Sequence, residues 1–215
     1  MINTEDNAPF SWAALEFLAK SMGQDILARQ IKRTTVSDYD QFIDILYADI
    51  DAIVHEIQLN PELRKDDDED RLSIEIKGNL THLGYGAAHE SKIGGHTDLS
   101  VQYKGFIWIG EAKINRGYEH IFQGFQQLTT RYATGDEGQC KGGLVIYIKS
   151  NNSKQVMDRW RANLDERGIT DLEFVESSIR PDHIFFTRHT HERSGRPFTT
   201  RHVGVILGFD PKDQK

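Results

Sequence analysis

Apolar side chains recur at helical spacing along the front third of the chain. The segments with this spacing are 11–32, 38–58 and 69–83. Ser37 stands before the second segment in the position of an N-cap, and Pro61 follows its end. The pattern predicts three helices. We assign the first two to a helical N-terminal appendage, residues 1–65, and the third to the start of the main domain, residues 66–215.

After residue 83 short apolar runs alternate with further helical stretches. Candidate strands occupy 87–92, 97–103, 106–114, 142–150 and 172–176, and candidate helices occupy 118–134 and 152–167. The run "GGLVIYIKS" at 142–150 is almost continuously apolar, which is typical of a strand buried on both faces. A hairpin with arms near 183–190 and 198–208 follows. This mixture of strands and helices predicts an α/β fold.

The strands at 97–103 and 106–114 carry charged residues inside an apolar pattern. If Lys104-Gly105 forms a two-residue turn, Asp98 pairs with Glu111 across the hairpin, with Cβ atoms roughly 4.5–5.5 Å apart. Lys113 then lies on the same face as Glu111. The opposite face is apolar and carries Leu99, Val101, Tyr103, Phe106, Trp108 and Ala112.

Two carboxylates that face each other repel, so this pairing needs an explanation. A divalent cation such as Mg²⁺ or Mn²⁺ removes the conflict, because both ions prefer oxygen ligands. Lys113 could then orient or help deprotonate a water and offset charge on a phosphate. The alternative is a solvated salt bridge between Lys113 and Asp98. Ile107 and Ile109 favour the metal, because they indicate that this face is covered.

Composition and charge narrow the classes of protein. The hydrophobic content of 38 % suits a globular domain, and the lone Cys140 fits a reducing, cytoplasmic location. We expect no membrane span, because no apolar run approaches ~18 residues, and no signal peptide, because "MINTEDNAPF" is polar and acidic. The net charge of −7 belongs to the front: residues 1–70 hold 16 acidic and 6 basic side chains, residues 71–215 hold 17 and 20. Binding of nucleic acid by the back of the chain is therefore not excluded.

The acidic pair and the lysine resemble the PD-(D/E)xK nuclease superfamily, which has the restriction-endonuclease-like fold. "HTD" supplies Asp98 and "EAK" supplies Glu111 and Lys113, each in the expected strand. The resemblance covers residues 69–150, where the order of helix, three strands, helix and strand agrees, and leaves out 1–60 and the terminal hairpin. It implies a central mixed sheet flanked by helices. It also implies one or two Mg²⁺ ions, with Mn²⁺ as a substitute, held by Asp98, Glu111 and the Ala112 carbonyl.

The same resemblance points to supporting residues on two helices. Members of the superfamily often carry a metal-supporting Glu in the first core helix, and Glu75 matches that place, with Glu69 as the alternative. Glu90, near the end of the first strand, is a further acidic candidate. Some relatives place a Gln and a Tyr on the helix after the third strand. "QQLTTRY" resembles this motif through Gln127 and Tyr132, with one residue more than the usual spacing, and Gln126 lies nearer the packed face of a helical wheel.

The terminal hairpin is rich in basic residues. We expect its arginines to contact a phosphate backbone. They are Arg188, Arg193, Arg196 and Arg201. A polar hairpin tip that only maintains solubility is the alternative. His189 and His191 share a strand face and could bind a transition metal, but no Cys cluster or third ligand supports them.

The expected function is hydrolysis of phosphodiester bonds in DNA by a metal-dependent nuclease. We expect cleavage within a strand, because no ATPase or clamp domain is recognisable in the sequence. Superfamily members work in restriction, repair, recombination and phage (antiviral) defence, and the fold does not choose among them. RNA as substrate stays open. A nucleic-acid-binding or assembly subunit that keeps the fold without turnover is the alternative. The apolar stripes of the front helices predict a homodimer.

Overall fold

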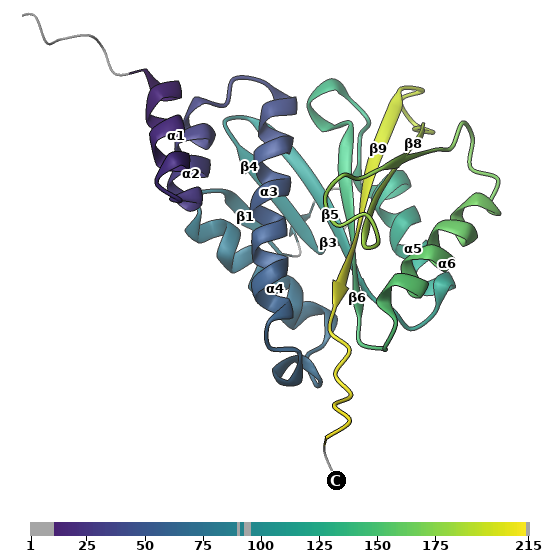
Figure 1. The fold of residues 1–215 in the computed structure, drawn as a ribbon. Helices are drawn as coiled ribbons and strands as arrows, with labels where there is room; N and C mark the ends of the chain where they lie inside the picture. The colour runs from purple at the N-terminus through teal and green to yellow at the C-terminus, as the bar shows by residue number, and fades with distance from the viewer. Residues whose placement is uncertain (1–10, 90, 93–95, 214–215) are drawn as a thin grey trace, which may run out of the picture. The chain divides into compact units, whose positions relative to one another are not determined.

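The computed structural model describes residues 11–89, 91–92 and 96–213 (Figure 1). The chain divides into two compact units, Met1–Asp49 and Ile50–Lys215. The boundary lies inside helix α3 (Tyr39–Gln58), whereas the sequence analysis placed it after residue 65. Across the described residues, no helix is both long and apolar enough to cross a membrane.

The smaller unit contains two helices where the spacing predicted one. Helix α1 (Trp12–Ser21) ends before Gly23, and helix α2 (Asp25–Thr35) begins just after it. Gly23 has a φ of 70°, a left-handed backbone conformation that ends a helix. Glycine adopts this conformation at little cost because it has no side chain. The prediction of a single helix over 11–32 was therefore wrong, because the apolar spacing continues across this break.

An ion-pair cluster joins α2 to the first part of α3. Arg29 Nε lies 2.9 Å from Asp49 Oδ1, and Arg33 pairs with the other carboxylate oxygen. At the start of α3, Asp38 Oδ1 accepts a hydrogen bond of 2.8 Å from the Gln41 N–H. Asp38, one residue after the predicted Ser37, therefore provides the N-terminal cap.

The larger unit is built on a mixed sheet. Seven strands of the described chain follow the order β1-β4-β5-β6-β9-β8-β7. Their bounds are β1 (Gly86–Ala88), β4 (Leu99–Tyr103), β5 (Phe106–Ile114), β6 (Lys141–Ile148), β7 (Glu173–Glu176), β8 (Ile184–Thr190) and β9 (Pro197–Ile206). Strands β2 (Ser91–Lys92) and β3 (His96–Thr97) form a separate pair. The α/β class is confirmed, whereas the first predicted strand, 87–92, is divided between the two sheets.

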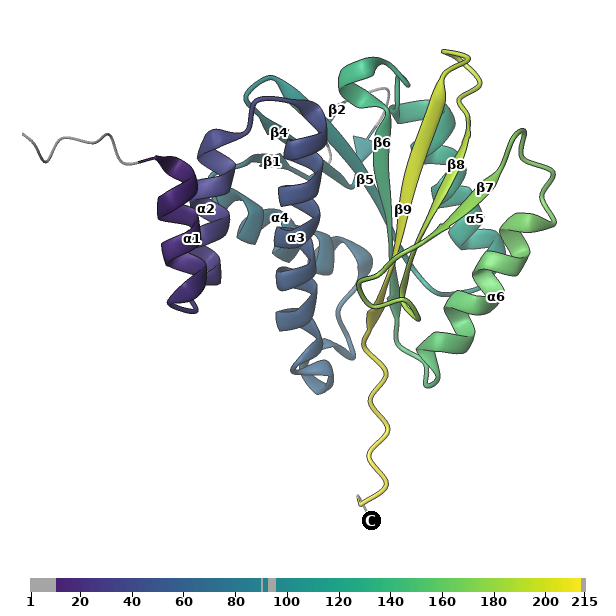
Figure 2. The same ribbon diagram turned by 45° about the horizontal axis from the view of Figure 1, so that its top comes forward.

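Parallel pairing holds the middle of the sheet together. Strand β6 runs parallel to both β5 and β9, whereas β4 pairs with β5 and β8 pairs with β9 in the antiparallel sense. The predicted terminal hairpin is present as β8 and β9. It continues the central sheet beside β6, as Figure 2 shows, and is not a free ribbon.

Helices cover both faces of this sheet. Helix α4 (Glu69–His82) lies on one face, where the Ser73 hydroxyl is 3.3 Å from the Tyr147 hydroxyl of β6. Helices α5 (Tyr118–Gln126) and α6 (Ser153–Asp165) lie on the other face, where the Trp160 N–H donates to His202 of β9 (Figures 1 and 2). Strand β5 is buried on both sides. The charged residues of β5 therefore lie inside the domain.

Trp108 explains two glycines of the sheet. A Cβ on Gly143 would come within 2.4 Å of Trp108 Cζ2, and a Cβ on Gly110 would come within 2.5 Å of Cη2. The indole ring thus lies directly against the backbone of β5 and β6. This close packing fixes the centre of the sheet on the face opposite Glu111 and Lys113.

Candidate active site

The hairpin of β4 and β5 brings the predicted residues together. Tyr103 pairs with Phe106 and Leu99 pairs with Gly110, so the predicted register is confirmed. Lys104 and Gly105 have φ values of 49° and 86°, as a two-residue hairpin turn requires. Asp98 lies in a bend between β3 and β4, one step before the ladder begins.

The bend at Asp98 attaches its carboxylate to β5. The Ala112 N–H donates a hydrogen bond of 2.8 Å to Asp98 Oδ2. Asp98 therefore contacts the backbone of the strand that carries Glu111 and Lys113. Ala112 was expected to offer its carbonyl to a metal, and the contact seen here involves its N–H. The carbonyl's role stays a prediction.

Lys113 lies at the centre of three carboxylates. Its Nζ is 2.7 Å from Glu111 Oε1, 3.3 Å from Glu69 Oε1 and 3.7 Å from Asp98 Oδ2. The side chain crosses Gly124 of α5, where a Cβ would come within 2.7 Å of Lys113 Cγ. Only a residue without a side chain allows α5 to lie this close, so Gly124 helps to fix the position of the ammonium.

Burial makes this cluster electrostatically costly. Glu111 is 1 % exposed, and its Oε2 atom has no hydrogen-bond partner among the residues described. Burial, followed by the charge of Asp98, raises the pKa of Glu111 to about 7. Burial also raises the pKa of Asp98. For Lys113, burial lowers the pKa, but Glu111, Asp98 and Glu69 together raise it above its ordinary value. The ammonium form is therefore favoured.

Glu69, and not Glu75, belongs to this cluster. Glu69 is the first residue of α4, and its Oε2 accepts a hydrogen bond of 2.7 Å from the Ile114 N–H. Glu75 instead forms two hydrogen bonds of 2.6 Å with the Arg64 guanidinium. The preference for Glu75 as a metal ligand does not fit this geometry, because its carboxylate already neutralises Arg64. The alternative, Glu69, does fit.

The donor set suits a hard divalent cation. Carboxylate oxygens from Asp98, Glu111 and Glu69 surround one point, and the unpaired Glu111 Oε2 gains a partner if a cation binds there. The described residues hold no group of three His, Cys, Asp or Glu side chains already arranged as metal ligands. The Lys113 ammonium lies between the carboxylates, so Lys113 would have to move when a cation entered.

A π-helix follows α5 and changes the relation between Gln127 and Tyr132. It spans Gln127–Tyr132, and the Ala133 N–H donates to the Leu128 carbonyl, five residues earlier. In a π-helix, residues five apart correspond to residues four apart in an α-helix. The extra residue in the motif is thereby absorbed. Tyr132 is buried, and its pKa is raised by burial and by the charge of Glu111.

The choice between the two glutamines follows from the same feature. Gln126 is exposed and Gln127 is half-buried, the opposite of the helical-wheel prediction. The wheel assumed α-helical spacing, which ends at Gln126. Gln127 is therefore the better candidate for a contact at the site, although that contact stays a prediction.

Two histidines near the cluster were missed by the sequence analysis. His120 Nε2 lies 3.6 Å from Glu69 Oε2, and His89 Nε2 lies 3.8 Å from Asp70 Oδ1. Both Nε2 atoms are buried without a hydrogen-bond partner among the described residues. No motif marked them, since each depends on how α4 begins. The further acidic candidate, Glu90, lies outside the described residues.

The predicted phosphate-binding arginines have different surroundings. Arg188 and Arg193 are exposed, and Arg196 is exposed but paired with Asp136 and Glu137. Arg201 is 3 % exposed, and its Nη2 donates to both carboxylate oxygens of Asp51 at 2.7 Å. The prediction for Arg201 does not fit this burial, because its guanidinium neutralises Asp51.

Histidines 189 and 191 lie in aromatic surroundings. His189 is 5.5 Å from Phe125 and 5.8 Å from Phe198, measured between ring centroids, and His191 is 5.5 Å from Phe198. Burial, followed by the charge of His191, lowers the pKa of His189 to about 4. The surrounding rings offer no third metal ligand, so the transition-metal alternative gains no support.

Comparisons with known proteins identified no relative of this chain. Neither a scan against protein-family models nor searches of the curated proteins and of the solved structures found a match to this chain.

Proposed function

We propose that this protein is a Mg²⁺-dependent nuclease of the PD-(D/E)xK type that hydrolyses phosphodiester bonds within DNA. The observation that carries the proposal is the arrangement of Asp98, Glu111 and Glu69 around Lys113, with one buried carboxylate oxygen left unpaired. Such a site has negative charge to hold a cation and an ammonium beside it to meet a phosphate.

The order of the elements supports the same class. A helix (α4), three strands in antiparallel pairs (β1, β4, β5), a helix (α5) and a parallel strand (β6) follow one another along the chain. This is the order of the restriction-endonuclease-like core. Asp98 immediately precedes the second of these strands, and Glu111 and Lys113 lie on the third.

Asp98, Glu111 and Glu69 would hold the cation. When bound, Mg²⁺ or Mn²⁺ supplies a positive charge that stabilises the phosphate as it becomes more negative. The metal also explains why Glu111 is kept in a place where burial favours its neutral form.

Lys113 has the second role. The three carboxylates raise its pKa and keep it charged at neutral pH when no cation is bound, and in that form it is a hydrogen-bond donor. In the reaction a water oxygen forms a bond to phosphorus while the bond from phosphorus to the 3′-oxygen breaks. That oxygen takes up a proton and the attacking water loses one. Lys113 orients the water and offsets charge on the phosphate oxygens, while Gln127 and Tyr132 line the approach.

Cleavage assays on several substrates test this proposal. Supercoiled plasmid, linear duplex DNA, single-stranded DNA and RNA are incubated with Mg²⁺, Mn²⁺ or EDTA. We expect nicking of the closed plasmid with either metal and none in EDTA. The variants Asp98→Asn and Lys113→Met should lower the rate at least about a hundredfold.

Helix α4 offers a matched control. Glu69→Gln should lower cleavage. Glu75→Gln removes a carboxylate from the same helix, but among the described residues that carboxylate forms hydrogen bonds only with Arg64. Glu75→Gln should therefore leave the rate unchanged. Cleavage that persists in EDTA or in Asp98→Asn would show that the activity does not come from a metal bound at this site. Tight DNA binding without cleavage under any metal would favour the non-catalytic binding or assembly subunit.

A further inference from the structure

A second polar feature lies on the far side of α5 from Lys113. A partly open cavity of about 210 Å³ is bordered by α5, the π-helix, the segment 167–170 and β8, and we name it the α5–β8 cavity. Its walls include Phe122, Phe125, Gln126, Thr129, His189 and Thr190. Gly124 of the same helix contacts Lys113. Because a helix is about 10–12 Å across, one strand of nucleic acid could reach both places.

One wall of the cavity presents flat aromatic surface. The rings of Phe122 and Phe125 are 6.2 Å apart between centroids, with their planes at 19°. The Arg167 guanidinium lies 4.1 Å from the centroid of Phe122 and is held there by Glu119 and Asn163. Phe125 is 2 % exposed, so a planar ring that enters this space can stack on the half-buried Phe122 or on a guanidinium whose position is already fixed.

His189, whose ring packs against Phe125, adds an unpaired polar atom to the lining. His189 is 5 % exposed, and its Nδ1 is buried without a hydrogen-bond partner among the described residues. Because burial lowers its pKa to about 4, His189 is neutral at physiological pH. A neutral imidazole can donate or accept one hydrogen bond but gives no charge to an anion. The wall therefore suits the polar edge of a neutral ring better than a phosphate.

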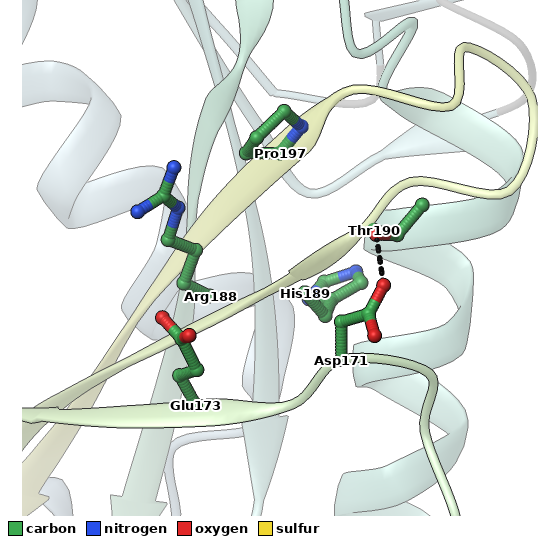
Figure 3. Close-up of a pocket in the computed structure, with 6 residues that line it drawn as sticks. All are labelled: Asp171, Glu173, Arg188, His189, Thr190 and Pro197. Carbon is green, nitrogen blue, oxygen red and sulfur yellow. Dashed lines mark hydrogen bonds between the residues drawn. The ribbon is translucent and has the colours of Figure 1, made fainter.

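A second cavity lies next to the α5–β8 cavity and shares two of its lining residues. Figure 3 shows it, lined by Asp171, Glu173, Arg188, His189, Thr190 and Pro197, so that His189 and Thr190 belong to both cavities. The Thr190 hydroxyl donates to Asp171 Oδ2 at 2.7 Å, and the Thr190 N–H donates to the Thr170 carbonyl at 3.3 Å. These bonds attach the segment before β7 to β8. The exposed Arg188 places a positive charge beside this shared wall.

A shallow hollow borders the α5–β8 cavity on the surface of α5 and the π-helix. It has a volume of about 260 Å³ and is lined by Gln123, Gln126, Gln127, Thr130 and Arg131. Gln126 and Thr130 also line the cavity, whereas Gln127 begins the π-helix that ends at Tyr132. The hollow therefore extends the cavity as a polar surface as far as Gln127 and Arg131.

We propose that the α5–β8 cavity binds one unstacked nucleobase. The ligand class is a flat, neutral heterocycle with hydrogen-bonding edges, which the aromatic wall, the fixed guanidinium and the unpaired imidazole nitrogen together match. The cavity is smaller than the roughly 300–1,000 Å³ of sites for drug-sized molecules, so it accommodates one ring system. This inference rests on the proposed nuclease function for its main source of bases, the DNA substrate. A free nucleotide is the other source.

Binding measurements in EDTA test the cavity independently of cleavage. A fluorescently labelled single strand carries one abasic site, moved position by position, and affinity is read by anisotropy. For the wild type we expect the loss of one base to weaken binding about tenfold, and its neighbours to matter much less. Thr130→Trp, which fills the mouth of the cavity from an exposed position, should remove this dependence on position.

Two further variants separate a filled cavity from damage elsewhere. Gln155→Trp adds the same indole to the exposed side of α6 and should retain the abasic effect. His189→Leu removes the unpaired nitrogen without adding bulk at the mouth, and should reduce the abasic effect while the protein stays folded by circular dichroism. A wild type that binds all abasic strands equally shows that no DNA base enters the cavity.

The second arm uses free deoxynucleoside monophosphates with the full chain, followed by saturation-transfer NMR. Base protons that receive saturation in the wild type and in Gln155→Trp, but not in Thr130→Trp, identify a free nucleotide as the ligand. If neither strand bases nor free nucleotides respond to filling the cavity, the proposal is overturned. Because both arms omit metal, the nuclease proposal can fail while this one stands, and the reverse also holds.

Discussion

Two groups of polar side chains lie beneath the same face of the sheet, and they meet the cost of burial in opposite ways. Around Lys113, three carboxylates lie within 3.7 Å of the ammonium and raise its pKa, so the lysine keeps its charge despite burial. On β8 and β9, His189 and His202 lose their charge instead. The first arrangement keeps a strong field in the interior, whereas the second removes it.

The histidine group shows how a ring becomes part of the core. His202 is fully buried, stacks on Phe185 with centroids 4.5 Å apart, and accepts a hydrogen bond from the Trp160 N–H. Its other nitrogen lies 2.8 Å from the Thr187 hydroxyl. Burial, followed by the charge of His189, lowers the pKa of His202 to about 3. Polarity here specifies packing, whereas polarity around Lys113 is what the proposed nuclease chemistry would use.

The largest effect should come from removing the ammonium. Lys113→Met leaves three carboxylates without their shared cation and should lower the free energy of unfolding by about 3–5 kcal/mol at pH 8 in EDTA. Urea denaturation measures the loss. Lys154→Met removes a lysine that pairs with Asp158 and Asp182 on the surface, and should change stability by less than about 1 kcal/mol. Equal losses in both variants would show that the ammonium of Lys113 stabilises its buried carboxylates no more than a surface lysine stabilises its partners.

The next effect distinguishes the two groups by pH. The folded-state pKa of Glu111, about 7, is above its ordinary value of 4.5, so the stability that Glu111 contributes is present below pH 4.5 and is lost as pH rises through 7. Glu111→Gln should abolish this loss, which amounts to about 3 kcal/mol. Urea titrations of both proteins from pH 4 to 8 in EDTA measure it.

The histidines should show the opposite slope. Their lowered pKa values mean that the stability they contribute is present above pH 6.5 and is lost as pH falls through about 4 for His189 and about 3 for His202. In the same titrations, His202→Leu should flatten the acid side of the curve, whereas Glu111→Gln should flatten the neutral side. Identical curves for both variants would contradict the distinction between the groups.

A smaller effect tests whether the two buried histidines differ. His202→Leu leaves the Trp160 N–H and the Thr187 hydroxyl without a partner and should cost about 2 kcal/mol at pH 8. His189→Leu removes an imidazole whose Nδ1 is already unpaired, so its cost should be under about 1 kcal/mol. Chemical denaturation at one pH compares them. A reversed order would mean that His189 has a partner in solution.

The smallest effect concerns the helix that lies on Lys113. Gly78→Ala in α4 meets open space and should stabilise the protein by about 0.5–1 kcal/mol. Gly124→Ala in α5 should not gain this stability, because its Cβ would press on the Lys113 stem, and the displaced ammonium should lower cleavage severalfold. Denaturation and plasmid nicking check the pair. A stabilised, fully active Gly124→Ala protein would show that this contact does not position Lys113.

Local patterns predicted the parts of the fold that depend on neighbouring residues. The turn at Lys104-Gly105 determines the register by counting, so the meeting of Asp98, Glu111 and Lys113 could be foreseen. Helices α3 and α4 and strand β6 likewise follow from their apolar spacing. In each case the information lies within about twenty residues of sequence.

Long-range partners decided what the patterns left open. Glu75 was preferred over Glu69 by its place in a helix, but Arg64, on a short turn before that helix, takes up its charge. Arg201 looked like a surface cation, but Asp51 lies opposite it from 150 positions earlier in the chain. No periodicity reports such pairings, because they arise only when separate elements pack together.

The widened turn that ends helix α5 has a consequence for how such sites are recognised. A motif written with a fixed gap treats Gln127 and Tyr132 as out of step, yet a coil that takes five residues instead of four between hydrogen-bonded partners restores their alignment. Insertion of a single residue thus need not separate two side chains that share one face of a helix. Searches that allow one extra position in this helix would recover chains that strict spacing discards.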